Sequence, residues 1–240
     1  MKKLCLLLLL FLSHFLLMPL ETTHAKGKQE PVPDTVADSH SKYTAYFQTN
    51  SGRYCTAILI SSTAALTARH CVGREPAERV GTIYPGQNGD KRPFGYMNIR
   101  TYIPNPNPKY DIAILKGTER DQDEFYKYYI RKFSTTVKGY TDEEFRVFMG
   151  QDAYAYGYPH GKQFRNNVQY RSDGKITSYK TKPIPYLLTD MPAFSGQSGS
   201  GVFKKDGKFL GIMVTRTKKN TANILPFTES IAKWINENAK

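Results

Sequence analysis

Ser198 is the residue whose surroundings most clearly suggest chemistry. It lies in the stretch PAFSGQSGSGVF, residues 192–203, where glycines and serines surround it before an apolar, strand-like segment begins. Such stretches are often flexible loops, yet the same glycines would permit a tight bend that exposes a nucleophilic hydroxyl. A serine hydroxyl needs a general base to take its proton, and usually a carboxylate to orient that base. The remaining sequence must therefore supply both groups.

His70 is the candidate base. Three histidines lie beyond residue 25, namely His40, His70 and His160, and all of them precede Ser198. This order excludes an α/β-hydrolase, in which the histidine follows the serine and the acid. His70 follows two apolar runs, TAILIS and AALTA, whereas His40 lies in a polar stretch and His160 in a YGYPHG turn, both typical of surface positions. The alternative is that His70 is simply a buried, hydrogen-bonded histidine.

Asp111 is the candidate acid. It precedes the apolar residues of KYDIAIL, which are typical of a buried strand, and an unpaired carboxylate drawn against a core is costly. An imidazole N–H would satisfy that carboxylate. The alternative is an aspartate that begins a strand and faces solvent.

The chain has three cysteines, Cys5, Cys55 and Cys71. If the first leaves with a signal peptide, an even pair remains in an oxidising compartment, which favours a disulfide between Cys55 and Cys71 over two free thiols. Two cysteines with so few histidines show no metal-ligand spacing. We therefore expect neither a metal site nor a cofactor.

The first 25 residues are predicted to be a secretory signal peptide. Lys2 and Lys3 precede an apolar run from Leu4 to Leu17, which is shorter than the roughly 20 residues of a spanning helix, and Ala25 supplies a small residue for cleavage. The alternative is an N-terminal membrane anchor. Cleavage predicts a secreted protein, extracellular or periplasmic, with no membrane span afterwards.

Beyond residue 43 the pattern predicts an all-β protein. Short segments rich in Ile, Val, Thr, Tyr and Phe alternate with turn signals such as KDGK at 205–208 and SDG at 172–174. Residues 26–42 are polar and contain two prolines, as expected of an N-terminal arm or a short pro-segment. Residues 119–148 fit a long connection with a helical turn at 142–148, and 228–240 fit a short helix capped by Thr228.

His70 in LTARHCV, Asp111 in YDIAIL and Ser198 in SGQSGSGVF, in that order, make the chain similar to chymotrypsin-like (trypsin-fold) serine proteases. It resembles most the bacterial glutamyl-endopeptidase and exfoliative-toxin branch. The likeness runs from about Tyr43 to the C-terminus and includes the GYPHGK turn, the GKITSY strand and Asp190. It implies two six-stranded antiparallel β-barrels within a domain of residues 43–240. The barrels would cover about 43–135 and 145–225, followed by a C-terminal helix at about 228–240.

The resemblance also implies roles for the candidate residues. Ser198 would attack a peptide carbonyl, His70 would take and return the proton, and Asp111 would hold the imidazolium. The backbone N–H groups of Gly196 and Ser198 would form the oxyanion hole. The chain would then be a secreted serine endopeptidase that acts through an acyl-enzyme on protein or peptide substrates.

Two positions depart from the relatives. Animal digestive enzymes carry an aspartate before the nucleophile, where it pairs with a newly cut N-terminus. The uncharged Gln197 cannot form that ion pair, so we expect other contacts to order the oxyanion turn. In the specificity pocket, Ala193 and Met213 replace the threonine and histidine of the glutamyl-specific branch. Neither residue can hydrogen-bond a substrate carboxylate, which favours a neutral or small-to-medium apolar P1 residue. Arg216 lies near the rim of the pocket, where it would either attract an acidic side chain or remain a solvated loop residue.

The formal net charge of +13 favours anionic surfaces or acidic proteins as partners. Lysine and arginine are scattered without a recognition motif, so no nucleic-acid partner is expected, and we expect a monomer. The alternative function is a catalytically silent protease-fold protein that uses its basic surface to bind an anionic partner.

Overall fold

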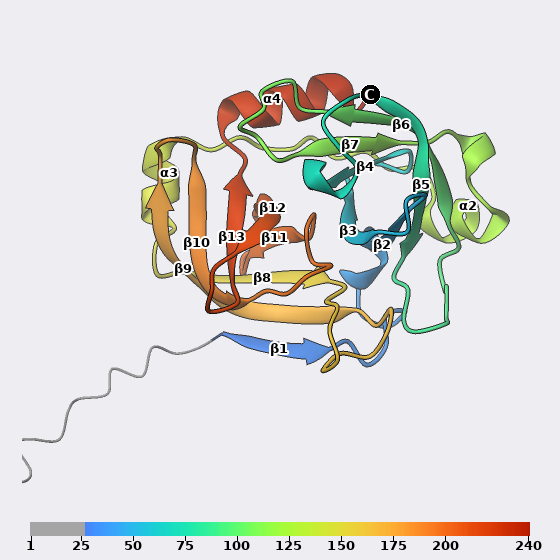
Figure 1. Ribbon diagram of the computed structural model, residues 1–240, viewed down its shortest axis with the longest axis horizontal. Coiled ribbons are helices and arrows are strands. Elements are labelled where there is room, and N and C mark those ends of the chain that lie inside the picture. The colour runs from blue at the N-terminus through green and yellow to red at the C-terminus, as the bar shows by residue number, and fades with distance from the viewer. Residues whose placement is uncertain (1–26) are drawn as a thin grey trace, which may run out of the picture.

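The computed structural model describes residues 27–240; the predicted signal peptide lies outside the described residues. The chain forms two β-barrels with few helices (Figure 1). The strands are β1 (Lys28–Pro31), β2 (Thr44–Thr49), β3 (Tyr54–Leu59), β4 (Ala64–Thr67), β5 (Ala77–Pro85), β6 (Met97–Pro104), β7 (Ala113–Lys116), β8 (Asp152–Gly157), β9 (Tyr170–Lys180), β10 (Tyr186–Pro192), β11 (Gly201–Lys204), β12 (Phe209–Arg216) and β13 (Thr221–Pro226). The helices are η1 (Ser41–Tyr43), η2 (Arg69–Cys71), η3 (Glu119–Asp121), α2 (Glu124–Ile130), α3 (Asp142–Val147) and α4 (Glu229–Asn238).

The first barrel is closed in the order β2-β3-β4-β7-β6-β5, and all its neighbouring strands are antiparallel. Its interior is filled by apolar side chains, and the four residues of β4 are all buried. Short strands rich in β-branched and aromatic residues suit a closed barrel because closure leaves no edge strand unpaired.

The second barrel consists of β8 to β13. Its strands pair in the order β9-β10-β13-β12-β11-β8, and antiparallel pairing of β8 with β9 closes the ring. Its core includes Ile176, Leu187, Val202 and Ile224, each fully buried. The predicted fold class of two six-stranded barrels with a C-terminal helix is therefore confirmed.

The α-helices lie in the connection between the barrels and at the C-terminus. The predicted turn at 142–148 contains α3, which Thr141 caps by accepting a hydrogen bond from the N–H of Glu144. The predicted terminal helix is α4, and it packs Ile231 and Ile235 against the core of the first barrel. The short helix α2 was not predicted. None of the helices in residues 27–240 is long and apolar enough to cross a membrane.

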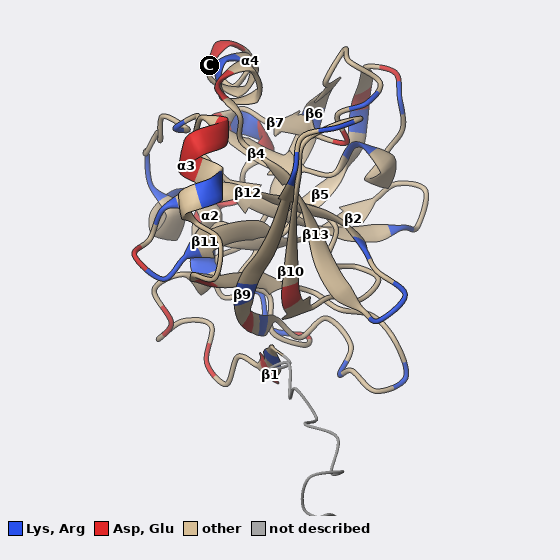
Figure 2. Ribbon diagram, turned by 90° about the vertical axis from the view of Figure 1, so that its left-hand side faces the viewer, with Lys and Arg blue, Asp and Glu red and all other residues tan. Residues whose placement is uncertain are grey.

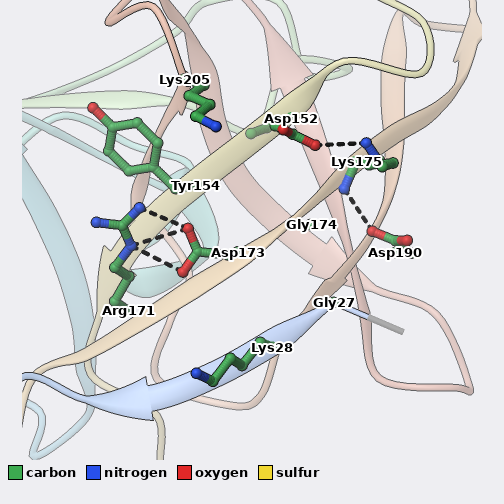
Figure 3. Close-up of a pocket in the computed structure, with 11 residues that line it drawn as sticks. Gly27, Lys28, Asp152, Tyr154, Arg171, Asp173, Gly174, Lys175, Asp190 and Lys205 are labelled. Carbon is green, nitrogen blue, oxygen red and sulfur yellow. Dashed lines mark hydrogen bonds and ion pairs between the residues drawn. The ribbon is translucent and has the colours of Figure 1, made fainter. Parts of the chain in front are cut away.

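Residues 27–35 are bound to the barrels. Strand β1 pairs antiparallel with β9, from Lys28 opposite Asp173 to Pro31 opposite Tyr170. The side chain of Val32 is 4% exposed. Figure 3 shows the start of β1 beside Asp173 and Gly174, where a surface cavity of about 380 Å³ lies among ion-paired side chains. The polar composition of the arm gave no signal for this strand.

Charged residues of both signs are interspersed over the surface. On the face drawn in Figure 2, α3 carries both signs, with Asp142, Glu143 and Glu144 in its first turn and Arg146 in its last turn. Most ion pairs among the described residues are exposed, such as Lys28 with Glu30, and contribute little to stability.

Candidate active site

His70 lies in η2, the single helical turn that follows β4. The turn is held in place by its neighbours. The guanidinium of Arg69 donates to the carbonyl of Pro108 at 2.6 Å, and the buried hydroxyl of Tyr102 lies 3.0 Å from the carbonyl of Arg69. Burial raises the pKa of Tyr102, so this hydroxyl stays protonated and able to donate. The backbone that carries His70 is thereby fixed to the loop that precedes Asp111.

Asp111 contacts His70 at two points. Its Oδ2 lies 2.6 Å from His70 Nδ1, and its Oδ1 accepts the backbone N–H of His70 at 2.9 Å. Asp111 precedes the fully buried Ile112, next to the start of β7. Because Asp111 directly precedes a buried strand, its carboxylate lies at the rim of the barrel. There the imidazole of His70 lies within hydrogen-bonding distance of it.

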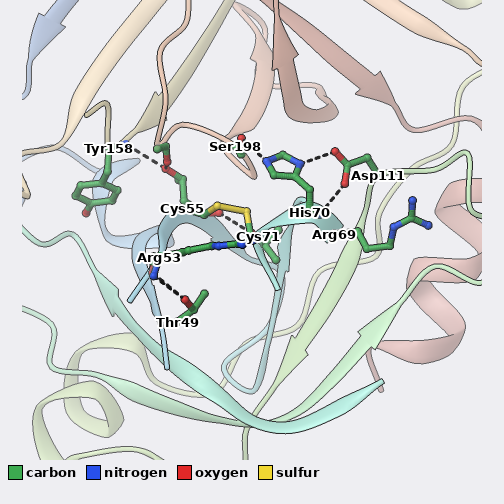
Figure 4. The surroundings of a disulfide bond; sticks show 12 residues. Thr49, Arg53, Cys55, Arg69, His70, Cys71, Asp111, Tyr158 and Ser198 are labelled. Carbon is green, nitrogen blue, oxygen red and sulfur yellow. Dashed lines mark hydrogen bonds and ion pairs between the residues drawn. A yellow bond between two sulfur atoms is a disulfide. The ribbon is translucent and has the colours of Figure 1, made fainter. Parts of the chain in front are cut away.

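Ser198 lies in the turn between β10 and β11. Its Oγ is 2.9 Å from His70 Nε2, so the three side chains form one hydrogen-bonded chain from serine to imidazole to carboxylate (Figure 4). His70 comes from the first barrel and Ser198 from the second, so the chain spans the junction between the barrels. This arrangement allows proton transfer from a serine hydroxyl to a base whose tautomer a carboxylate fixes.

The turn that carries Ser198 depends on two glycines. Gly196 has a φ of +90°, in the left-handed region, and a Cβ at this position would lie 2.3 Å from the carbonyl of Tyr158. Gly199 has a φ of +92°, and a Cβ there would lie 2.0 Å from the carbonyl of Thr56. Because only glycine adopts such backbone angles without strain and fits such close approaches, the glycine-rich stretch is a tight turn and not a flexible linker.

Both barrels fix the backbone of this turn. The N–H of Thr56 in β3 donates to the carbonyl of Ser198 at 2.9 Å, and the N–H of Gly199 donates to the carbonyl of Met213 in β12 at 2.7 Å. Within the part of the chain that the structure describes, the N–H groups of Gly196 and Ser198 donate to no backbone carbonyl. They are therefore available to an external acceptor.

Cys55 and Cys71 form the predicted disulfide beside His70 (Figure 4). The bridge joins β3 to η2 across a sequence separation of 16 residues. It constrains the residue that follows His70 and thereby the position of the imidazole.

In residues 27–240, one group of metal-ligand atoms is found, formed by Cys55, His70 and Cys71. The two sulfurs are bonded to each other, so neither is a thiolate, which is the form that binds metals. The group does not fit a metal centre.

The predicted specificity residues lie together beside Ser198. Ala193, Met213 and Arg216 line one cavity of about 150 Å³ with Ser198 itself. Ala193 and Met213 are buried, at 1% and 2% exposure. Arg216 is exposed and hydrogen-bonds the side chain of Asn220. Ala193, Phe194 and Met213 form the apolar part of the cavity wall, and Ser195, Ser198, Thr215 and Arg216 form its polar part.

Several contacts near the site were not predicted. The hydroxyl of Thr56 donates to the carbonyl of Gly196 at 2.9 Å. The backbone N–H of His160 donates to the carbonyl of Ser195 at 2.6 Å, and the ring of His160 lies 2.8 Å from the hydroxyl of Tyr54. These contacts join segments more than 30 residues apart and have no local sequence signal.

Comparison with known proteins shows the family and the fold of the chain. Residues 55–212 match the family described as the trypsin-like peptidase domain. Among solved structures, the chain is similar to a Glu endopeptidase, with a TM-score of 0.69, 22% identity, and coverage of 87% of this chain and 95% of that one. It is also similar to the protease Anisep from Arthrobacter nicotinovorans, with a TM-score of 0.64, 16% identity, and coverage of 88% and 99%. At these identities the structures show the fold alone.

A curated relative from Bacillus subtilis (strain 168), named extracellular metalloprotease, is 25% identical over 169 residues. That match covers 66% of this chain and 49% of the relative. The chain thus spans about half the length of the curated relative that it matches.

Proposed function

The chain belongs to the family of trypsin-like peptidase domains, and on this premise we propose that it hydrolyses peptide bonds with Ser198 as nucleophile, His70 as base and Asp111 as orienting acid. The observation that carries the proposal is the hydrogen-bonded chain from Ser198 Oγ through His70 to Asp111, with links of 2.9 and 2.6 Å.

In the first half of the reaction, Ser198 Oγ attacks the substrate carbonyl carbon while His70 Nε2 takes the hydroxyl proton. The carbonyl oxygen becomes an oxyanion that accepts hydrogen bonds from the N–H groups of Gly196 and Ser198. His70 then gives the proton to the departing amine, the C–N bond breaks, and an ester of Ser198 remains.

In the second half, water attacks the ester carbonyl as His70 takes its proton. The second tetrahedral intermediate collapses, the proton passes to Ser198 Oγ, and the carboxylic acid product leaves. Asp111 keeps the imidazole in the tautomer with Nε2 free to accept, because its carboxylate binds the Nδ1 proton. No metal or cofactor takes part in these steps.

The cavity beside Ser198 supports a neutral or small-to-medium apolar P1 residue. Its buried wall includes Ala193 and Met213, which offer no hydrogen bond to a substrate carboxylate. The disulfide supports a secreted protein, since such bonds persist in oxidising compartments. Secretion, extracellular or periplasmic, and a monomeric state are parts of this proposal.

A peptide library incubated with the purified protein tests the function. We expect cleavage by the wild type and by Ser51→Ala, which removes an exposed serine of a distant turn, and no cleavage by Ser198→Ala. A profile confined to glutamate at P1 would contradict the pocket assignment. If the wild type cleaves nothing and does not react with a fluorophosphonate, the silent binding protein is the better account.

A further inference from the structure

Gln197 closes the turn that precedes Ser198. Its side chain is fully buried, and its Oε1 accepts the backbone N–H of Phe194 at 2.8 Å. Its own backbone N–H donates to the carbonyl of Phe194 at 3.2 Å, and its carbonyl accepts the N–H of Ser200 at 3.0 Å. The side chain of Gln197 therefore holds the backbone at Phe194, and its backbone groups bind on both sides of Ser198.

Gln29 in β1 reaches the same side chain. Its Nε2 donates to Gln197 Oε1 at 3.1 Å and to Ser172 Oγ in β9 at 2.7 Å. Gln197 Nε2 also lies 3.3 Å from Ser172 Oγ. Gln29, Ser172 and Gln197 thus form a closed group of hydrogen bonds, here called the amide network, and its members are 25 to 168 residues apart in sequence.

The strand that carries Gln29 is fixed at both ends. Before it, the N–H of Gly27 donates to the carbonyl of Asp190 at 3.2 Å. After it, the N–H of Val32 donates to the carbonyl of Gln169 at 2.8 Å, and the buried hydroxyl of Thr35 donates to the carbonyl of Gly86 at 2.6 Å. The side chain of Gln29 is therefore presented by an ordered strand and not by a loose tail.

We propose that Gln29 is a positioning residue that holds Gln197 and, through it, the turn whose Gly196 and Ser198 amides face the substrate oxyanion. This role rests on the proposed function, because it concerns the oxyanion hole of that reaction. Gln197 is uncharged and cannot form an ion pair with a newly cut N-terminus. In this proposal the neutral amide network holds the turn in its ordered conformation. A newly cut N-terminal amine is then not needed to order it.

The physical reason lies in the freedom of Gly196. A glycine moves between backbone conformations at little cost, so its N–H points toward the substrate only if its neighbours hold it. Without the donor on Gln29, the buried Oε1 of Gln197 has one hydrogen-bond partner fewer, which is costly. The turn can then adopt other conformations, in which the N–H of Gly196 no longer points toward the substrate.

Gln29→Glu tests the proposal with a side chain of almost the same shape. Its carboxylate donates no N–H to Gln197 Oε1 at neutral pH. Glu30→Gln is the matched control, since Glu30 is an exposed neighbour whose carboxylate pairs with Lys28. Removal of a full oxyanion donor costs about 100- to 1000-fold in kcat, so we expect Gln29→Glu to lower kcat by about 10- to 100-fold with KM within about twofold. Glu30→Gln should match the wild type.

Amide hydrogen exchange supplies a second readout that needs no activity. Peptides covering residues 194–199 should exchange faster in Gln29→Glu than in the wild type and in Glu30→Gln. Gln29→Lys restores N–H donors and should recover part of the lost kcat.

Unchanged kcat and unchanged exchange in Gln29→Glu would overturn the proposal. The proposal would also be overturned if the fall in kcat merely matched the fall in the fraction of folded protein, as measured by a thermal melt. Gln29 would then contribute only to stability. If the wild type fails to react with a fluorophosphonate, the proposed function fails, and the exchange of 194–199 alone then decides whether Gln29 holds the turn.

Discussion

The imidazole of His70 and its own backbone N–H contact the same carboxylate, with Asp111 Oδ2 at 2.6 Å and Oδ1 at 2.9 Å. The two contacts fix the position of the ring and favour the tautomer that carries its proton on Nδ1. In the proposed reaction these contacts make Asp111 the residue that orients the base, and replacing Asp111 tests that role.

Asp111→Asn should preserve the fold and lower kcat by about 10⁴-fold, because an amide in this place stabilises the wrong imidazole tautomer. Steady-state kinetics on a cleavable peptide measure the effect. Asp90→Asn, at an exposed loop position, should retain wild-type kcat. Equal activity in both variants would show that Asp111 does not orient the base.

Replacing Cys55 and Cys71 together by serine should lower the free energy of unfolding by about 3 kcal/mol, as expected for a disulfide that closes a loop of this length. Denaturant titration measures the change. Because the bridge adjoins His70, kcat should fall as well, under conditions where the variant remains folded. A double variant with wild-type stability and wild-type kcat would contradict this role.

Ala193 is buried and lines the cavity beside Ser198. The larger side chain in Ala193→Leu should therefore narrow this cavity. One methylene in such a pocket changes discrimination by about 10- to 200-fold, so kcat/KM should fall more for leucine at P1 than for alanine at P1. Competition between the two peptides in one reaction gives the ratio directly. An unchanged ratio would place the P1 side chain elsewhere.

Alkaline pH should destabilise the protein through its buried tyrosines. Burial raises the pKa of Tyr46 to about 12, whereas a tyrosine in the unfolded chain has a pKa of about 10. The unfolded state therefore releases its proton first. Protonated Tyr46 therefore contributes fully to the free energy of unfolding below about pH 10. This contribution is lost as the pH rises from about 10 to 12.

Tyr46→Phe should therefore lose less stability than the wild type between pH 9 and about 11. Denaturant titrations at several pH values measure this difference. Tyr128→Phe removes a hydroxyl from a side chain that is 65% exposed and serves as the control. Parallel curves for all three proteins would contradict the prediction.

The sequence was sufficient to predict that Ser198, His70 and Asp111 lie together because the signals for each residue are local. Ser198 stands among glycines, Asp111 precedes a buried strand, and His70 stands beside a cysteine. Each of these neighbourhoods reflects a constraint at the site itself. The order of the three residues excluded an α/β-hydrolase, and the many short strands indicated an all-β fold.

The role of Gln29 could not be predicted in this way. The residue lies in a polar segment without apolar periodicity, and its partners Ser172 and Gln197 are 143 and 168 residues away. A hydrogen bond between such distant amides depends on the register of β1 on β9, which no local pattern specifies. Helix α2 was missed because it is short, although Asp123, which caps it, was a usable signal.

The central claim is that Ser198 becomes acylated with the help of His70. Intact-mass and peptide mapping after reaction with a fluorophosphonate test it most directly. We predict one added group, on the peptide that contains Ser198, in the wild type and in Ser51→Ala, and none in Ser198→Ala or His70→Ala. Labelling at another residue, or equal labelling of Ser198 in His70→Ala, would contradict the account.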